Sequence, residues 1–364
     1  MNASVTALNS HDNQRRRSAV LPTPAQLRQR LPLSHALSQQ IARQRNEIRA
    51  VLNGDDPRLL VVVGPCSLHD RDAALEYAER LVQLNKQVGE HLLLVMRAYV
   101  EKPRTTVGWK GLLYDPLLDG SSNMADGLAM SRQLMLDIVE LGLPLATELL
   151  QPLAAGYLDD LLSWAAIGAR TSESQIHREM VSGLDLPVGF KNGTDGSLSI
   201  ACDAMRSAAH PHQHFGVNDH GQPALIHTHG NPDTHLVLRG GHTGPNYQPE
   251  AVAAARAALH KQGIVPTLIV DCSHANSGKD PSRQPEVLAS VVAQRLDGDS
   301  SLRGVMLEGH LFDGCQPLTT ALQYGVSVTD ACLGWSATAQ ALLDAASRLA
   351  KAASAQQTEE VEAC

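Results

Sequence analysis

The sequence predicts an α/β fold: a (β/α)8 TIM barrel with an N-terminal extension and an inserted β-hairpin. Eight short aliphatic runs alternate with longer segments of helical periodicity, which is typical of a parallel sheet covered on both faces. Hydrophobic residues make up 43% of the 364 residues but aromatic residues only 3%, so aliphatic side chains must build a large core. Charged residues gather where the runs end, as they do at the functional face of such a barrel.

The extension is predicted to cover residues 1–57. Its first twenty or so residues are polar and are expected to be mobile. Residues 24–53 are expected to be helical, with Ser34 capping a run of apolar residues at helical spacing. The stretch NGDDP then ends the helical pattern before the first strand. This extension is a candidate for a role in regulation or in oligomer contacts.

The barrel is predicted to span residues 58–350. The run PALIHTHG from Pro223 is expected to belong to a hairpin inserted in one connection, and residues 351–364 are expected to fray. The eight predicted strands are LLVVVG from Leu59, LLLVMRAY from Leu92, LPLATE from Leu143, WAAIGAR from Trp164, LPVGFK from Leu186, HLVLRGG from His235, TLIVDCSH from Thr267 and GVMLEGH from Gly304.

Composition excludes several classes of protein. A formal net charge of -8 argues against binding to nucleic acid or to an anionic membrane surface. The six cysteines show no spacing of a secreted scaffold and are expected to be reduced thiols. No export core follows the run Arg15–Arg17, and no stretch approaches the roughly 18 apolar residues of a membrane span. The sequence therefore predicts a cytoplasmic protein.

The ends of the eight runs carry the residues that indicate function. Strand C-termini and the following loops form the functional face of this fold, so these side chains are expected to meet. A salt bridge at the rim would explain any one of them, but it explains the whole set poorly. The runs finish at or near Cys66, Arg97, Glu148, Arg170, Lys191, Arg239, His274 and Glu308.

Six cations form the first part of this set. In an acidic chain, so many buried or half-buried like charges need anionic partners. Arginine suits bidentate binding of phosphate or carboxylate, and lysine supplies a compact charge. Two phosphates and one carboxylate would match the number of charges, although the KPRT stretch alone could be a solvated loop. The six are Arg97, Lys102, Arg104, Arg170, Lys191 and Arg239.

Four potential metal ligands form the second part: Cys66, His274, Glu308 and Asp330. Thiolate, imidazole and carboxylate ligands together suit one divalent transition metal ion, and they do not choose among Mn, Fe, Co and Zn. No local spacing proves such a site, and a buried thiol with a satisfied core histidine is the alternative. The other histidines, in HPHQH and in IHTH, are interpreted as a loop cluster and a solvent-facing strand pair.

Seven strings carry a resemblance to a known family. They resemble 3-deoxy-D-arabino-heptulosonate-7-phosphate (DAHP) synthase, and most closely its microbial, feedback-regulated class I alpha type. The resemblance runs from about Leu59 to Trp335 and implies condensation of phosphoenolpyruvate with erythrose 4-phosphate, with release of phosphate. The strings are VVVGPCSLHD, RAYVEKPRTTVGWKGL, IGARTSESQ, GFKNGTDGSL, LRGG, DCSHANSGKD and YGVSVTDAC.

The resemblance also implies roles for matching positions. The metal would be held by the four ligands named above and would act as a Lewis acid on the aldehyde. Lys102 is the candidate proton donor. The substrate-binding residues would be Arg170 and Arg239 for the phosphoenolpyruvate phosphate, with Glu148 nearby, then Arg97, Lys102 and Lys191 for its carboxylate, and Arg104 and Thr105 for the aldose phosphate.

The region that would correspond to the family's effector site departs most from the sequence that is usual in the family. Ser172 replaces a usual threonine and keeps the hydroxyl, whereas LLQPLAAGY lacks a usual Pro-Gln pair. Feedback inhibition by tyrosine, tryptophan or phenylalanine is expected, and an enzyme without an effector is the alternative. The sequence HFGVNDHGQPALIHTHGNPD favours tyrosine slightly. The resemblance also implies a homodimer or homotetramer. The candidate effector residues are Gln151, Gly156, Asp185 and His214.

Three other functions are alternatives. A Schiff-base aldolase could use Lys191 as its nucleophile, but the arginines nearby favour anion binding at that lysine. A relative acting on arabinose 5-phosphate is the second alternative, and the KPRT stretch favours the four-carbon sugar. A barrel that binds phosphorylated metabolites without catalysis is the third, and the intact ligand set argues against it.

Overall fold

The structure is a computed structural model that describes residues 19–104, 106–319 and 321–362, with only the backbone described beyond residue 355. The expectation that the first twenty or so residues are mobile falls almost wholly outside these ranges. In the described part of the chain, eight parallel strands close into a barrel in the order β1-β10-β9-β8-β5-β4-β3-β2. The strands are β1 (Leu59–Gly64), β2 (Leu92–Arg97), β3 (Leu145–Glu148), β4 (Trp164–Ile167), β5 (Val188–Lys191), β8 (Thr234–Leu238), β9 (Leu268–Asp271) and β10 (Leu302–Glu308).

These strands are the eight runs that the sequence predicts, so the predicted fold class is confirmed. Almost all of their residues are buried, on both faces of the sheet, which explains the nearly continuous aliphatic character of the runs. Leu60 and Val62 of β1 pack with Ile269 and Met306 inside the barrel, whereas Val61 and Val63 pack with the surrounding helices. One strand thus serves two cores through its alternating side chains.

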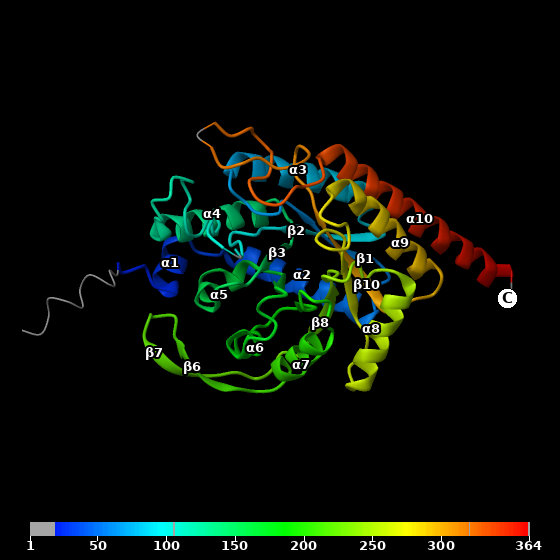
Figure 1. The fold of residues 1–364 in the computed structure, drawn as a ribbon, viewed down its shortest axis with the longest axis horizontal. Helices are drawn as coiled ribbons and strands as arrows, with labels where there is room; N and C mark the ends of the chain where they lie inside the picture. Colours follow the sequence, from blue (N-terminus) through cyan, green and yellow to red (C-terminus); the bar gives the residue numbers. More distant parts are fainter. Residues whose placement is uncertain (1–18, 105, 320, 363–364) are drawn as a thin grey trace, which may run out of the picture.

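Helices surround the barrel, and Figure 1 shows α9 and α10 on one side of it and α6 and α7 on another. The last helix, α10, extends through Glu362 and so includes most of the segment expected to fray. Ala, Gln and Glu are good helix formers, which favours this continuation. The helices are α3 (Arg71–Val88), α4 (Met124–Glu140), α5 (Pro152–Leu158), α6 (Gln175–Val181), α7 (Ser199–Ala208), α8 (Pro249–Lys261), α9 (Gln284–Leu296) and α10 (Trp335–Glu362).

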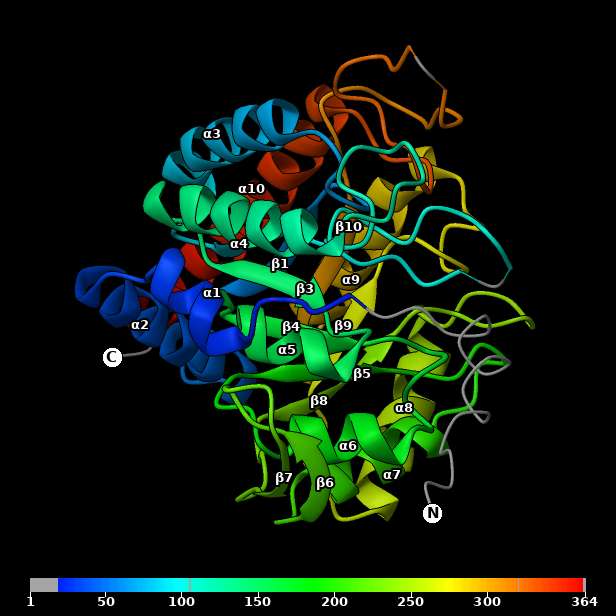
Figure 2. The ribbon, with the colours of Figure 1, turned by 90° about the vertical axis from the view of Figure 1, so that its left-hand side faces the viewer.

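The segment before the barrel forms two helices, α1 (Pro24–Arg30) and α2 (His35–Asn53), rather than one helical stretch. Pro32 interrupts the helical pattern. The Ser34 hydroxyl accepts a hydrogen bond from the backbone N–H of Leu37 and so caps the start of α2. Three residues of the last turns of α2, Ile48, Val51 and Leu52, are buried with the residues inside the barrel. Figure 2 shows α2 on the side away from the long rim loops, so this helix closes the N-terminal end of the barrel.

The inserted hairpin is confirmed as the antiparallel pair β6 (Gln213–Val217) and β7 (Pro223–His227). It lies between α7 and β8 in the sequence and outside the barrel in space (Figure 2). In the turn of the hairpin, the Asp219 carbonyl accepts a hydrogen bond from the backbone N–H of Ala25. This bond joins the hairpin to α1. No helix in the described ranges is long and apolar enough to cross a membrane.

Candidate active site

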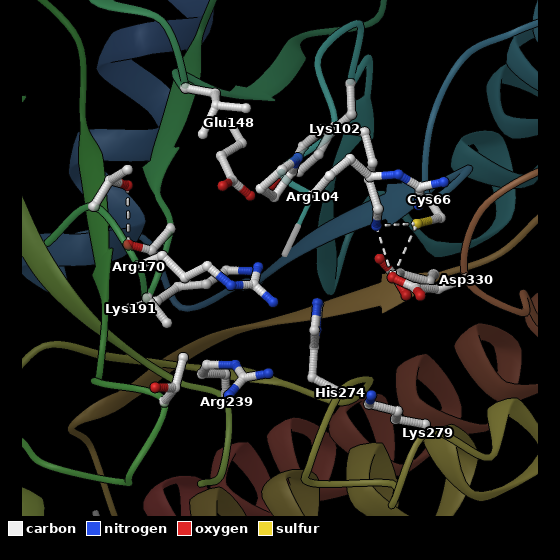
Figure 3. Close-up of a pocket in the computed structure, with 18 of the residues that line it drawn as sticks. Cys66, Lys102, Arg104, Glu148, Arg170, Lys191, Arg239, His274, Lys279 and Asp330 are labelled. Atoms are coloured by element: carbon white, nitrogen blue, oxygen red, sulfur yellow. Dashed lines mark hydrogen bonds and ion pairs between the residues drawn. The ribbon is translucent and has the colours of Figure 1, made fainter. Parts of the chain in front are cut away.

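A cavity of about 460 Å³ opens at the carboxyl ends of the barrel strands (Figure 3). It brings together all of the residues at which the eight runs end, together with Lys102, Arg104 and Asp330. Thr105 lies outside the described residues. The predicted residues that line the cavity are Cys66, Arg97, Lys102, Arg104, Glu148, Arg170, Lys191, Arg239, His274, Glu308 and Asp330.

One corner of the cavity contains a thiol and two carboxylates. One ligand atom each from Cys66, Glu308 and Asp330 lies within 4.8 Å of the others. The Lys102 Nζ atom lies 2.6 Å from an Asp330 carboxylate oxygen and 2.9 Å from the Cys66 sulfur. Figure 3 shows these three side chains meeting at the edge of the cavity. Two of the three potential metal ligands, Cys66 and Asp330, therefore already contact a positive charge, the Lys102 ammonium.

The charges of this corner suit a bound cation. Burial and the neighbouring Glu308 carboxylate raise the pKa of the Cys66 thiol to about 11. Burial opposes ionisation of Asp330, but the Lys102 ammonium holds the pKa of that carboxyl at about 2. A thiol with so high a pKa becomes a thiolate at neutral pH when a metal ion binds it. Sulfur and oxygen ligands in this arrangement fit a divalent transition metal ion.

His274 faces the cavity, but it is not within the 4.8 Å group of Cys66, Glu308 and Asp330. Its Nδ1 lies 2.9 Å from an Asp271 carboxylate oxygen and 2.8 Å from the Ser273 hydroxyl. These contacts use one ring nitrogen and leave Nε2 for the cavity. Metal-binding histidines are commonly held by a carboxylate in this way. The structure thus places His274 beside the corner in a suitable orientation.

The cationic wall of the cavity contains two fully buried charges, Arg97 and Lys191. Arg97 donates to the Pro65 carbonyl and pairs with Glu308 at 3.1 Å, and its guanidinium lies 3.9 Å from the centre of the Tyr99 ring. Its Nη1 is buried without a hydrogen-bond partner among the described residues. That nitrogen is therefore a donor available to a bound anion.

Lys191 pairs with Asp271 at 3.0 Å. Burial alone would lower the pKa of this lysine, but the Asp271 carboxylate raises it above the usual value. A lysine that forms a Schiff base needs a lowered pKa. The charge on Lys191 therefore favours anion binding over nucleophilic catalysis.

Arg170 and Arg239 complete the cationic wall from the loops after β4 and β8. The Arg239 N–H donates to the Asn192 side chain at 2.8 Å, which fixes the backbone of its loop against β5. Glu148 approaches Gly168 so closely that a Cβ at residue 168 would collide with its carboxylate. The glycine therefore lets Glu148 lie beside the arginine loop.

Several lining residues were not among the predicted site residues. Tyr99, Thr194 and Lys279 line the cavity, and Asp271 holds both His274 and Lys191. Asp271 is the last residue of its strand, so the rule that singled out the other strand ends would have found it. Lys279 lies eight residues after that strand and has a left-handed backbone with φ 65°. Nothing in its local sequence indicates that it returns to the rim.

The four candidate effector residues lie in three places, which are α5, the segment before β5 and the hairpin. Gln151 caps the start of α5, and Gly156 lies within that helix, where its carbonyl accepts a hydrogen bond from Arg28. Asp185 precedes β5 and pairs with Arg49 at 2.7 Å. His214 lies on β6 of the hairpin. Contacts join α1 to α5 and to the hairpin turn, and none of the four candidate residues lines the active cavity.

Comparisons with known proteins agree with this site. The family model described as the DAHP synthetase I family matches residues 32–343. A Tyr-sensitive phospho-2-dehydro-3-deoxyheptonate aldolase of Escherichia coli (strain K12) is 55% identical over 322 residues, which cover 88% of this chain and 90% of the relative. A phenylalanine-inhibited relative of Saccharomyces cerevisiae is 46% identical over 331 residues, covering 88% and 89% of the two chains.

Solved structures show the same likeness. The phospho-2-dehydro-3-deoxyheptonate aldolase of Francisella tularensis SCHU S4 is 42% identical and superposes with a TM-score of 0.89. That likeness covers 92% of this chain and 98% of the other. The corresponding enzyme of Thermotoga maritima is 20% identical with a TM-score of 0.54 and shows the shared fold alone.

Proposed function

This chain belongs to the DAHP synthetase I family, and from that premise we propose how its cavity carries out the family's reaction. The enzyme is a transferase that condenses phosphoenolpyruvate with D-erythrose 4-phosphate and water to give DAHP and phosphate. This reaction is the first step towards the aromatic amino acids. The observation that carries the proposal is one cavity in which seven arginine and lysine side chains lie beside a cysteine and two carboxylates.

The cationic wall divides between the two substrates in this proposal. Arg170 and Arg239 bind the phosphate of phosphoenolpyruvate, with Glu148 beside them. Arg97, Lys102 and Lys191 bind its carboxylate, for which the unpartnered Nη1 of Arg97 offers a buried donor. Arg104 and Thr105 bind the phosphate of the aldose. Holding two repelling anions in reacting geometry can supply about 7 kcal/mol or more of the barrier.

The corner of the cavity is proposed to hold one divalent metal ion, which is Mn, Fe, Co or Zn. Cys66, Glu308, Asp330 and His274 would be its ligands, and Asp271 would orient His274. When bound, the ion supplies Lewis-acid polarisation of the aldehyde oxygen. A metal ion at Cys66 and Asp330 would replace the ammonium that contacts both residues. Lys102 is then available to deliver a proton from Nζ to the alkoxide that forms during condensation.

Regulation and assembly extend the proposal. The names of the relatives include Tyr-sensitive, tyrosine-inhibited and Phe-sensitive enzymes, which supports feedback inhibition here by an aromatic amino acid, with tyrosine favoured. We place the effector near Gln151, Gly156, Asp185 and His214. We also propose a cytoplasmic homodimer or homotetramer in which residues 1–57 form a regulatory extension, residues 58–350 the catalytic barrel and residues 351–364 a tail.

Substrate consumption tests this function. Purified enzyme with Mn²⁺ is mixed with phosphoenolpyruvate and either erythrose 4-phosphate or arabinose 5-phosphate, and released phosphate and the sugar product are measured. We expect phosphate release with the four-carbon sugar, with aromatic amino acids in parallel samples identifying the effector. Release with the five-carbon sugar alone would assign the other substrate. No release with either sugar would support a binding protein without catalysis.

A further inference from the structure

A second cavity, of about 340 Å³, lies at the opposite end of the barrel from the active site. Its walls come from the last turn of α2, the chain entering β8, the loop before β9 and the start of β10. Figure 2 shows α2 on this side, away from the long rim loops. The lining residues used below are Arg49, Leu52, Asp233, Ile264, Val265, Pro266 and Arg303.

The two arginines of this cavity differ in their partners. Arg49 pairs with Asp233 at 2.6 Å and with Asp185 at 2.7 Å, so its charge is matched. The Nε of Arg303 is buried, and no hydrogen-bond partner for it occurs among the described residues. Its guanidinium lies against Gly54, where a Cβ would collide with it. Arg303 is therefore a half-buried cation that lies near the Asp55 carboxylate but forms no ion pair within 4 Å in the described part of the chain.

The rest of the cavity wall is mixed, with polar residues such as Asn53 and Thr267 beside apolar ones. Leu52, Ile264 and Pro266 line the cavity, and Val265 lies at its edge with 80% of its surface exposed. Its volume falls within the range of sites for small molecules, which combine apolar walls with a few placed polar groups. The cavity thus combines the Arg303 guanidinium, whose buried Nε has no hydrogen-bond partner among the described residues, with three apolar side chains.

We infer that this cavity binds a small amphipathic monoanion, with an apolar body against Leu52, Ile264 and Pro266 and a carboxylate on the Arg303 guanidinium. A planar guanidinium pairs with a carboxylate through two parallel hydrogen bonds. The Asp233 carboxylate and the negative C-terminal end of α2 disfavour a ligand with two negative charges. Binding would join α2 to the barrel at a place distinct from the rim where substrates bind.

Benzoate is a suitable probe because it has one carboxylate and one apolar ring. Binding of 4-fluorobenzoate is followed by fluorine NMR on enzyme saturated with phosphoenolpyruvate and Mn²⁺, so that the active cavity is filled. We expect saturable binding by the wild type and at least a fivefold rise in Kd for Arg303→Met. Arg256→Met, which changes an exposed arginine on α8, should leave Kd unchanged.

A second variant keeps the test independent of any folding defect in Arg303→Met. Val265→Asp adds a negative charge at an exposed position on the cavity edge and should raise Kd at least threefold. Ile176→Asp, at an exposed position of α6, is its matched control and should leave Kd unchanged. Absence of binding to the phosphoenolpyruvate-saturated enzyme, or equal affinity of Val265→Asp and the wild type, would overturn the inference.

Discussion

Lys102 is the residue at which the two halves of the active cavity meet. Its ammonium contacts Cys66 and Asp330, and the neighbouring Arg104 lines the anion-binding side. The sequence indicates the three residues separately, with Lys102 as a cation after β2, Cys66 as a thiol after β1 and Asp330 as a carboxylate in the segment between β10 and α10. It does not indicate that the lysine lies between the other two, because that contact joins residues 36 and 228 positions apart.

Cys66 gives the sharpest prediction for the metal ion. Cys66→Ala removes the sulfur ligand, so metal binding should be lost and activity should fall at least about a hundredfold, since changes even behind the ligands commonly reduce metal affinity or activity by 10- to 100-fold. Metal content by elemental analysis, activity and circular dichroism are measured together. Cys202→Ala is the matched control, because Cys202 is buried on α7 away from the cavity. Near-normal activity of Cys66→Ala would disprove the assigned ligand.

Arg239 gives a prediction for substrate binding. Arg239→Ala should raise the KM for phosphoenolpyruvate about tenfold to a hundredfold, because a hydrogen bond to a charged group contributes about 1.5–3 kcal/mol. The KM for erythrose 4-phosphate should change much less. Steady-state kinetics with each substrate varied in turn measures the difference. Equal effects on the two constants would contradict binding of the phosphoenolpyruvate phosphate by this arginine.

At the scale of elements, the strands were the most predictable part and the effector region the least. Aliphatic runs identify these strands because parallel strands in a barrel are buried on both faces and so need apolar side chains at almost every position. The break between α1 and α2 follows from Pro32 and the Ser34 cap, both visible in the sequence. The contact of Asp219 with Ala25 is not visible there, because it joins the hairpin turn to a helix almost 200 residues earlier.

The docking of α2 on the barrel should depend on Arg49. Arg49→Ala removes a 2.6 Å ion pair with half-buried Asp233 and should lower the free energy of unfolding by about 1–2 kcal/mol. The second partner, Asp185, is 86% exposed and should contribute little. Urea unfolding compares this variant with Arg43→Ala, an exposed arginine of the same helix. Equal midpoints for the two variants would show that the ion pair does not secure α2.

At the scale of the whole molecule, barrel topology made most of the site predictable. Every strand end reaches one rim, so eight residues scattered over the sequence could be assigned to one cavity before any contact was known. Topology does not determine which of these residues pair with one another. The pairing of Asp271 with Lys191 joins the ends of β9 and β5, which are not neighbours in the barrel, and the placement of His274 and Lys279 depends on the conformation of the loop after β9.

Acid should destabilise the whole fold partly through His235. Burial lowers the pKa of this histidine to about 3, whereas the unfolded chain takes up its proton near pH 6.5. Its contribution to stability is therefore complete above about pH 6.5 and is lost as the pH falls towards 3, by up to about 1.4 kcal/mol per pH unit. Urea unfolding at pH 7, 6 and 5 should show a smaller decrease for His235→Gln than for the wild type. Parallel decreases would exclude this histidine as a source of acid sensitivity.

The central claim is a synthase whose turnover requires one metal ion at Cys66. The most direct test adds Mn²⁺ in steps to metal-free enzyme and measures bound ion and phosphoenolpyruvate consumption with erythrose 4-phosphate in the same samples. The account predicts a rate that rises in proportion to bound ion and reaches its plateau at one ion per chain. Full consumption by the metal-free enzyme, with borohydride trapping substrate on Lys191, would contradict it and support a lysine aldolase.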